Sequence, residues 1–395
     1  MNEELFTSDV IYVAAADSTE KDKALANYIC TGVNDQDVIQ EAVDTIATPK
    51  CGEIRGIRII LLSGNYYISD FPRRNGNGRV AVMTGIETNK YEHIGIVICG
   101  SEYTQSTIIH VTQECYDSVD PDESCSIFAS ADENWNQHIF KDLYITVPDD
   151  QKNIICIDGR FMGSLNLRRC KCLCDSQGSY LTPKKALPVE GFVGFMGNYG
   201  SKNMWENKWE SCMADGFGQG FALGGEHLVL IKCAARFGRY GYTFNNYPLR
   251  VGIVGHPMTL FNCIDEANGN MWKFAKNNNR QCVNAYNTSF ETFPEWLALE
   301  GHYSYEENPG DYCGHIDYVP NHGCDSSNCV DVPFWEKGSG IGFNTVNNVH
   351  RKVITSAERR TYSANIGQEV FDIDLGKKVI YTGSNWYDLM GNLVD

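Results

Sequence analysis

The chain is short of positive charge. Its 395 residues include 33 Lys and Arg against 50 Asp and Glu, which gives a formal net charge of −17 at pH 7. Phosphate backbones and anionic lipid surfaces repel a protein of this charge, so we expect no nucleic acid and no broad anionic membrane surface as a partner. A polyanionic substrate is disfavoured in the same way unless basic residues gather in a groove.

Long hydrophobic runs are also missing. Residues 1–6 are acidic and contain no apolar segment of a secretory signal. Nowhere do the roughly 18 apolar residues of a membrane span follow one another. We therefore expect a chain without a signal peptide, made in the cytoplasm and not inserted into a membrane.

Cysteine is plentiful, with 16 residues, but a disulfide framework is typical of short secreted chains. This chain is long, and many of its cysteines fall at inward positions of the expected strands, so we expect most of them to be reduced core residues. A separate group lies in a loop rich in Gly, Asn and Pro, and consists of Cys313, His315, His322, Cys324 and Cys329. Its spacing matches no standard zinc finger, so a loop disulfide or free thiols are favoured over a metal. We expect neither a metal nor a cofactor.

Three segments of the chain align when each is placed on a cysteine. Cys212, Cys233 and Cys263 are separated by 21 and then by 30 residues. Nine residues beyond each cysteine stands an aromatic residue, and two further on an apolar one: Phe221, Tyr242 and Trp272, followed by Leu223, Phe244 and Phe274. Self-similarity at such a period is typical of a solenoid, in which each unit packs on its neighbours.

The units are expected to be strands, because apolar residues alternate within them and Gly or Asn separates the runs. About 21 residues make one turn of a parallel β-helix, whereas helical repeats usually need about 33. The alternation places the three cysteines on the inward side together with Ala214, Ala235 and Asp265. A fourth coil is predicted at Cys172 and a weaker fifth at Thr288.

The first hundred residues have their own order of elements. A strand at residues 10–13 precedes a Tyr-x-Cys-x-Gly segment and a helix, with Asn34 or Asp35 as the helix cap. Strands at residues 57–62 and 94–99 follow, and the second of them ends at Gly100. The apolar face of the helix comprises Val38, Ile39, Ala42, Val43 and Ile46.

This order resembles the N-terminal cap and first coils of pectate-lyase-like parallel β-helix proteins, over about residues 8–300. The resemblance implies an all-β, right-handed, single-stranded parallel β-helix with an N-terminal capping helix. It implies little about activity, because that superfamily includes lyases, hydrolases, transferases, epimerases and phage tail-spikes. The Arg-rich calcium site and the ordered Asp cluster of a pectate lyase have no residue-by-residue counterpart here, which weighs against lyase chemistry.

The end of the chain departs from this pattern. From about Ser356, short strands, a turn at Leu375-Gly376 and an anchoring Trp386 predict a small β-meander. The segment is similar to the closing module of tail and tail-fibre-like proteins of phages and prophages of gut Firmicutes. The usual pattern there is Gly-x-x-Phe-Asp-x-x-Leu-Gly-Lys, then apolar residues and Gly-x-x-Trp-x-Asp. We therefore divide the chain into a capped β-helix at residues 1–350 and a C-terminal module at residues 351–395, and the similarity implies assembly into a virion or tail particle.

Charged residues recur three positions beyond the aligned cysteines. This charged column consists of Asp175, Asp215, Arg236, Glu266 and Glu291, on strand faces that are expected to point outward. Asp215 and Glu266 would lie two coils, or roughly 9.6 Å, apart, near the upper end of the roughly 6.5–9.5 Å of an inverting glycosidase pair. In this hypothesis they are acid and base, Arg236 keeps one of them ionised, and Asp175 and Glu291 contact substrate. The alternative is a solvated face with cross-strand ion pairs.

Aromatic residues crowd the middle of the chain, as expected of a protein that stacks on sugar rings. The interval from Cys233 to Cys263 is nine residues longer than the interval before it, and this excess falls in a loop at residues 245–256. Loops of solenoids commonly line a binding site. Asp265 is a further catalytic candidate because it faces inward, although a turn residue capped by nearby amides is the simpler explanation. The candidate substrate contacts are Trp209, Tyr247, Arg250, His256 and Trp296, whereas the repeat assigns Tyr242 and Trp272 to the core.

The favoured function is a tail-spike-like receptor-binding protein of a phage or prophage that recognises a bacterial surface polysaccharide. We expect a homotrimer, because such solenoids bury lateral apolar surface by threefold association. Cleavage of the glycan, as by a glycoside hydrolase acting as a polysaccharide depolymerase, stays open. One alternative is an intracellular carbohydrate-active enzyme of the same fold, a glycoside hydrolase or fructotransferase that acts on an imported oligosaccharide. Another is a structural fibre or adhesin without catalysis.

Overall fold

The computed structural model divides into two compact units, Met1–Asn344 and Thr345–Asp395. The residues that it describes are 10–45, 54–73, 78–84, 93–101, 106–130, 137–179, 186–197, 207–224, 228–244, 257–268, 270–274, 281–292, 314–320, 342–343, 352–362, 369–388 and 390–394.

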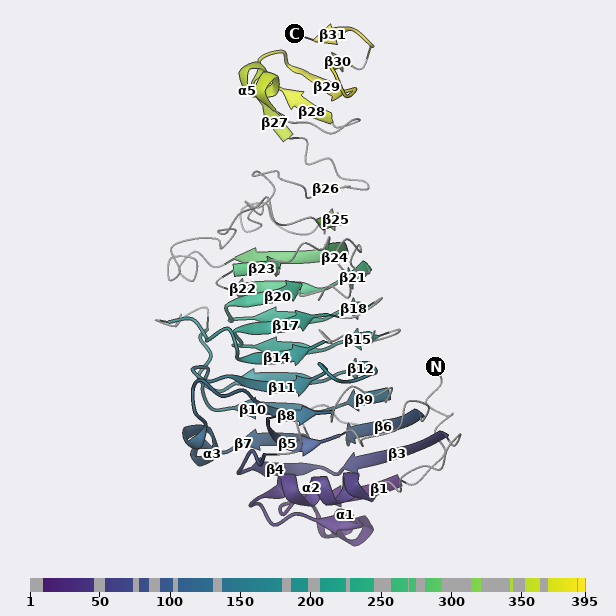
Figure 1. The fold of residues 1–395 in the computed structure, drawn as a ribbon, viewed down its shortest axis with the longest axis vertical. Helices are drawn as coiled ribbons and strands as arrows, with labels where there is room; N and C mark the ends of the chain where they lie inside the picture. Colours follow the sequence, from purple (N-terminus) through teal and green to yellow (C-terminus); the bar gives the residue numbers. More distant parts are fainter. Residues whose placement is uncertain are drawn as a thin grey trace. The chain divides into compact units, whose positions relative to one another are not determined.

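The first unit is a solenoid of parallel strands arranged in three sheets, which we call A, B and C. Successive strands of the chain enter the three sheets in turn, so each strand pairs with the strand of the next coil. Figure 1 shows the coils stacked as layers. Sheet C contains seven strands, one for each coil that it closes. The predicted solenoid of parallel strands is confirmed.

The strands of each sheet follow one another along the solenoid. Sheet A contains β1 (Val10–Ala14), β3 (Ile54–Leu61), β6 (His93–Gly100), β9 (Gln137–Lys141), β12 (Ser164–Arg168), β15 (Lys208–Glu210), β18 (Val229–Ile231), β21 (Pro257–Phe261), β24 (Gln281–Thr292), β25 (Gly314–Pro320) and β26 (Gly342–Phe343), and β2 (Tyr28–Ile29) pairs with β1. Sheet B contains β4 (Gly64–Ile68), β7 (Thr107–Val111), β10 (Tyr144–Val147), β13 (Lys171–Cys174), β16 (Met213–Asp215), β19 (Ala234–Arg236), β22 (Ile264–Asn268) and the end of β24. Sheet C contains β5 (Arg79–Met83), β8 (Cys125–Ala129), β11 (Ile154–Asp158), β14 (Val193–Met196), β17 (Gln219–Leu223), β20 (Tyr240–Phe244) and β23 (Asn270–Phe274).

The aligned cysteines lie at the corner between sheets A and B. Each follows one residue with a positive φ, such as Ser211 at 55° and Lys232 at 54°, and this single left-handed residue turns the chain from one sheet into the next. Cys212, Cys233 and Cys263 point into the core with at most 1% exposure. The cysteines whose side chains the structure describes are free thiols, and all of these but Cys99 are buried, as predicted.

The predicted position of the fourth coil is wrong by two residues. Lys171 pairs with Met213, and Cys172 pairs with Ala214, so Cys170 rather than Cys172 matches Cys212. The weaker fifth coil at Thr288 is confirmed, because Ile264 pairs with Ser289.

The aromatic residues Phe195, Phe221 and Tyr242 form a column on the inner side of sheet C. Phe195, Phe221, Tyr242 and Trp272 are paired from coil to coil. The Phe221 ring stacks on Phe195 and on Tyr242, with 5.2 Å between centroids in each case. The second half of the predicted register is therefore confirmed.

A helix covers the N-terminal end of the solenoid, as predicted. Helix α2 (Asp35–Asp44) follows the short helix α1 (Glu20–Leu25) and lies against the first coil (Figure 1). The Asp35 carboxylate accepts a hydrogen bond from the Tyr67 amide, at 2.9 Å. Gln40 donates to the Met83 carbonyl and accepts from the Met83 amide, at 3.0 and 2.7 Å. Asn34 occupies the cap position without a side-chain cap hydrogen bond. Side chains of α2 thus satisfy backbone groups of β4 and β5 that have no preceding coil.

The C-terminal unit has a five-stranded sheet and one helix. Strands β28 (Glu369–Asp372), β29 (Lys377–Tyr381), β30 (Trp386–Asp388) and β31 (Leu393–Val394) form an antiparallel meander with the predicted turn and a buried Trp386. Strand β27 (Lys352–Ile354) pairs with β28 in parallel, and α5 (Ser356–Thr361) connects them. The helix was not predicted, although Thr355 and Glu358 form the capping box that would have indicated it.

Candidate functional site

The predicted charged column lies on the outer side of sheet B. Asp215 pairs with Arg236, Arg236 with Glu266, and Glu266 with Glu291, on successive coils. The side chain of Glu291 is outside the described residues. Asp175 does not belong to this column, because Leu173 is the residue paired with Asp215. That prediction was wrong for the same reason as the coil at Cys172.

Asp215 and Arg236 form an ion pair with two hydrogen bonds. Arg236 donates from Nε and Nη2 to the two carboxylate oxygens, at 3.0 and 2.7 Å. These hydrogen bonds raise the pKa of Arg236 against the effect of its partial burial. The Asp215 side chain is only 2% exposed. A general acid or base must reach its substrate, so Asp215 would become available only if Arg236 moved.

Two further carboxylates of the solenoid have the same arrangement. Asp142 pairs with Arg169, and Asp158 pairs with Arg160, and both carboxylates are at most 3% exposed. The recurrence of a buried Asp under a partly exposed Arg favours a structural role for Asp215 and Arg236. A catalytic role for Asp215, Arg236 and Glu266 stays a prediction.

Asp265 faces the interior of the solenoid, as its parity predicts. It lies within β22 rather than in a turn, and its Oδ1 accepts a hydrogen bond from Asn268 Nδ2 at 2.6 Å. Its Oδ2 is buried without a hydrogen-bond partner among the described residues. A Cβ placed on Gly241 would collide with this carboxyl group, so a larger residue at position 241 would displace the Asp265 side chain. Burial raises the pKa of Asp265 well above its usual range, although the hydrogen bond from Asn268 acts in the opposite direction.

The predicted substrate contacts are only partly placed. Trp209 is fully buried, and its Nε1 donates to the Leu165 carbonyl at 3.1 Å, so the prediction that it contacts substrate was wrong. Tyr247, Arg250, His256 and Trp296 lie outside the described residues.

The loop that contains Cys313, His315, His322, Cys324 and Cys329 also lies outside the described residues, apart from the backbone of His315 in β25. In the part of the chain that the structure describes, no three His, Cys, Asp or Glu side chains gather as metal ligands would.

A polar network that the sequence analysis missed lies on the same face of sheet B, nearer the N-terminus. His110 Nε2 lies 2.9 Å from Asn65 Oδ1, and His110 Nδ1 lies 2.8 Å from Thr146 Oγ1. Asn65 Nδ2 donates to Asp17 at 2.6 Å, which leaves Asn65 Oδ1 to accept. His110 therefore carries its proton on Nε2, and Thr146 donates to Nδ1. Burial lowers the pKa of His110, although Asp175 and Asp17 act in the opposite direction.

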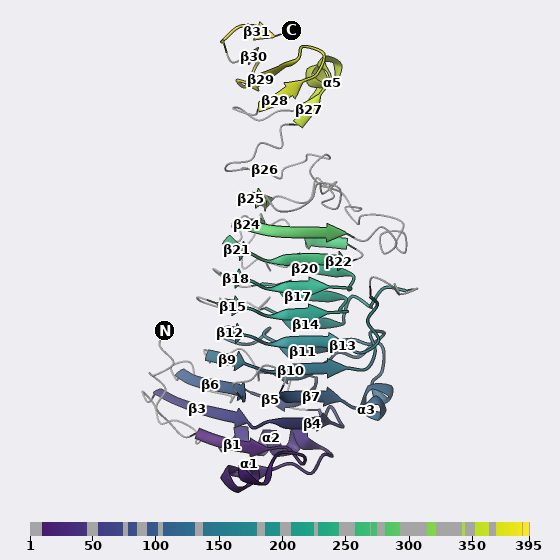
Figure 2. The ribbon, with the colours of Figure 1, turned by 180° about the vertical axis from the view of Figure 1, so that it is seen from behind.

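Two half-buried tyrosines flank this network. Tyr67 stacks on His110 with 5.4 Å between centroids, and Lys171 Nζ lies 5.2 Å from the centre of the Tyr144 ring. Asp175 is exposed beyond the end of β13, where partial burial raises the pKa of its carboxyl and His110 lowers it. Tyr67, His110, Tyr144, Lys171 and Asp175 form what we call the sheet B patch. Figure 2 shows strands β4, β7, β10 and β13, which position it, one above another.

The sheet B patch combines flat aromatic rings with an ammonium group and a carboxylate. Aromatic faces suit the apolar faces of sugar rings, and the charged groups suit sugar hydroxyls. Burial and the charge of Asp175 raise the pKa of Tyr144, so its hydroxyl stays protonated at neutral pH. The patch therefore presents aromatic and charged groups together on the outer side of sheet B.

No described helix is long and apolar enough to cross a membrane.

Comparison with known proteins identifies no family. No protein-family model matches the chain, and no curated protein matches it. A solved structure named ORF18 of Geobacillus virus E2 is similar over 90% of this chain and 82% of that chain, at 9% sequence identity and a TM-score of 0.29.

Proposed function

We propose that the chain is a glycan-recognising solenoid protein of a phage or prophage tail, which binds a bacterial surface polysaccharide through the outer side of sheet B. The observation that supports this most is the sheet B patch, in which Tyr67 and Tyr144 keep partly exposed rings beside Lys171 and Asp175. The sequence similarity of the C-terminal module to tail proteins supports the proposal that the chain belongs to a phage or prophage tail. The strongly negative chain favours a neutral or cationic glycan over a polyanionic one.

Recognition without cleavage is favoured over hydrolysis. The Asp215 carboxylate is buried and paired with Arg236. Catalysis by an acid and base pair that includes Asp215 therefore requires Arg236 to move, whereas binding of a glycan does not. We propose a homotrimer, as such tail proteins would form, and expect neither a metal nor a cofactor to take part.

The proposal is tested by binding to a panel of capsular and wall glycans. We expect Tyr144→Ala and Tyr67→Ala to weaken binding by up to about tenfold, because aromatic stacking contributes about 0.5–1.5 kcal/mol and 1.4 kcal/mol is tenfold. Asp175→Asn is a milder variant, because its exposed side chain leaves the fold untouched. Tyr12→Ala is the matched control, since Tyr12 is a half-buried tyrosine on the outer side of β1 in sheet A. Binding to no glycan of the panel, or equal loss in all three tyrosine variants, would refute the proposal.

A further inference from the structure

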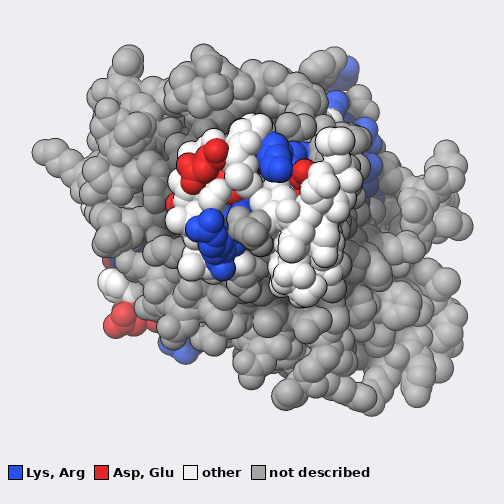
Figure 3. Space-filling model, turned by 90° about the horizontal axis from the view of Figure 1, so that it is seen from above, with Lys and Arg blue, Asp and Glu red and all other residues white. Residues whose placement is uncertain are grey.

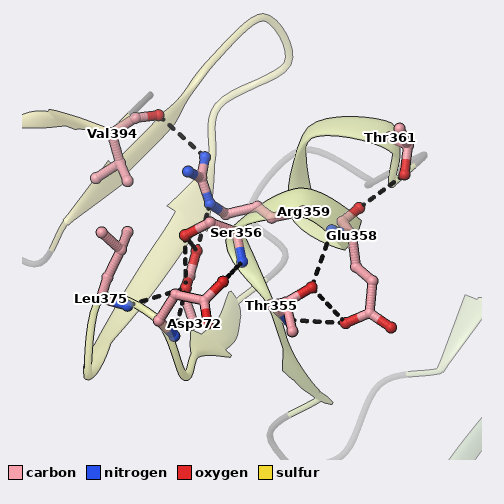
Figure 4. A network of polar contacts seen from close by, with 9 residues as sticks. Thr355, Ser356, Glu358, Arg359, Thr361, Asp372, Leu375 and Val394 are labelled. Carbon is pink, nitrogen blue, oxygen red and sulfur yellow. Dashed lines mark hydrogen bonds and ion pairs between the residues drawn. The ribbon is translucent and has the colours of Figure 1, made fainter.

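The sheet of the C-terminal unit has one face that its own helix covers. On this face lie Val370, Val379, Trp386 and Val394, which form the buried core of the unit. The α5 helix packs here, since Tyr362 after its end lies 6.4 Å from Trp386 between ring centroids. Figure 4 shows Arg359 of α5 reaching Asp372 and the Val394 carbonyl, at 2.7 and 3.0 Å.

The opposite face of this sheet is largely apolar, although Lys378, paired with Phe371, and Glu369, paired with Ile380, also lie on it. Strand pairing places Ile380, Tyr387 and Leu393 side by side across β29, β30 and β31, and Phe371 on β28 shares their side. Leu393 is 56% exposed, and the other three side chains are half-buried. An antiparallel sheet that faces water on one side normally carries polar residues there. This composition therefore indicates a surface that is covered in the working protein.

Further exposed apolar residues lie at one end of the same sheet. Ile373 and Leu375 stand in the turn between β28 and β29, at 51% and 40% exposure, and Met390 stands in the turn between β30 and β31, at 87%. The meander brings these two turns to the same end. The apolar face thus continues around the edge of the sheet, as an interface patch does.

Charge indicates what covers this face. Residues 345–395 contain six Lys and Arg and six Asp and Glu, so the net charge of −17 belongs to the solenoid alone. Two solenoids repel one another, whereas two C-terminal units do not. In the view of Figure 3, the described surface carries both signs of charge beside uncharged residues. A second C-terminal unit is therefore the occupant that the charge distribution favours.

We propose that the face formed by Phe371, Ile380, Tyr387 and Leu393 is the surface through which copies of this chain associate. The surface supplies the contact of the homotrimer proposed above, and in this it rests on the proposed function. It would also add buried apolar area to a unit of about fifty residues whose described core has four buried apolar side chains, since domains this small often need oligomerisation.

The test compares masses by light scattering at micromolar concentration. We expect the wild type to exceed the monomer mass of 44.3 kDa and Leu393→Asp and Tyr387→Asp to fall to it. Leu25→Asp is the matched control, because Leu25 on α1 is 59% exposed but belongs to the solenoid. Circular dichroism of each variant distinguishes lost association from lost folding. A second readout is the melting temperature, which rises with protein concentration only when copies associate.

The outcomes separate the two proposals. Variants that keep the wild-type mass while the wild type is oligomeric would overturn this surface and leave the homotrimer standing. A monomeric wild type would overturn both the surface and the homotrimer. Glycan binding is measured independently on the same samples, so its presence or absence tests the proposed recognition alone.

Discussion

Single residues of the solenoid decide between two roles for its carboxylates. Asp142, Asp158 and Asp215 are buried and paired with arginine, which makes them parts of the fold. Asp265 is buried without an arginine partner, and burial raises its pKa instead. Asp175 is exposed beside aromatic rings, and it is the carboxylate best placed to meet a ligand.

The buried Asp265 predicts a dependence of stability on pH. Its folded pKa lies above its unfolded value of about 3.9, so the carboxyl costs stability above pH 4 and nothing below it. We expect Asp265→Ala, which copies Ala235 in the same column, to raise the free energy of unfolding at pH 7 by about 1–3 kcal/mol. Urea unfolding at pH 7 and pH 4 measures this, and the gain should shrink at pH 4. A loss of stability at pH 7 would mean that the hydrogen bond from Asn268 contributes more than the burial of the carboxyl costs.

Hydrolysis, if it occurs, is tested most cleanly at Glu266. Glu266→Gln should cut turnover of a cleaved glycan by roughly 10²–10⁴-fold, as loss of general acid or base catalysis does. Asp215→Asn is less clean, since it also removes the partner of Arg236. Reducing-end release from each bound glycan is the measurement. Wild-type turnover in Glu266→Gln would remove this residue from the chemistry.

At the scale of elements, the corner between sheets A and B depends on one residue per coil. Ser211 has a φ of 55° and an exposed side chain, so a substitution there acts mainly through the backbone. The corner therefore tolerates many side chains, provided that the residue can adopt a positive φ.

We expect Ser211→Val to destabilise the solenoid by about 1–2 kcal/mol, because a β-branched residue disfavours the left-handed conformation. Ser211→Gly should instead be neutral or stabilising by up to about 1 kcal/mol. Chemical unfolding of the two variants measures the difference. Equal stability of the Val and Gly variants would show that the corner relaxes to another conformation.

The sequence predicts the register of a coil only where its pattern fits a single alignment. The register of Cys212, Cys233 and Cys263 was found because an aromatic residue follows each at a fixed distance. Cys170, Cys172 and Cys174 alternate with a period of two, so each of them suits an inward position. The alternation alone therefore does not distinguish Cys170 from Cys172 as the match to Cys212. The predictions of a fourth coil at Cys172 and of Asp175 in the charged column failed together for this reason.

The candidate site was predicted less well, because its members come from different coils. Trp209 aligns with Leu230 and Leu260, which are core residues, and this alignment already indicated that it is buried. His110 meets Asn65 and Thr146 across 45 and 36 residues. No repeat connects these three residues, and only the stacking of coils brings them together.

At the scale of the whole molecule, the two units have separate cores. The core of the C-terminal unit is supported by the Arg359 and Asp372 ion pair, in which both side chains are at most 1% exposed (Figure 4). Burial alone would raise the pKa of Asp372, but Arg359 and Ser356 lower it below its usual range. Its contribution to stability is therefore full above about pH 4 and is lost as the pH falls through the folded pKa.

We expect Arg359→Ala to cost the C-terminal unit about 3–5 kcal/mol, as removal of one partner of a buried ion pair does. A unit of this size is stable by only about 3–8 kcal/mol, so most of its structure should melt at lower temperature. Calorimetry should show that the transition of the solenoid is unchanged. Arg360→Ala, at an exposed neighbour, is the control. A single transition that shifts as a whole would mean that the two units unfold together.

The hydrogen bonds from α2 to the first coil also bear on aggregation. Without Asp35 and Gln40, the backbone groups of β4 and β5 would be an open template on which strands of other chains could add, as in fibril growth. Because α2 occupies that edge, molecules at high local concentration cannot elongate into filaments from their N-terminal ends. The cap formed by α2 thereby keeps the first coil from pairing with strands of neighbouring molecules.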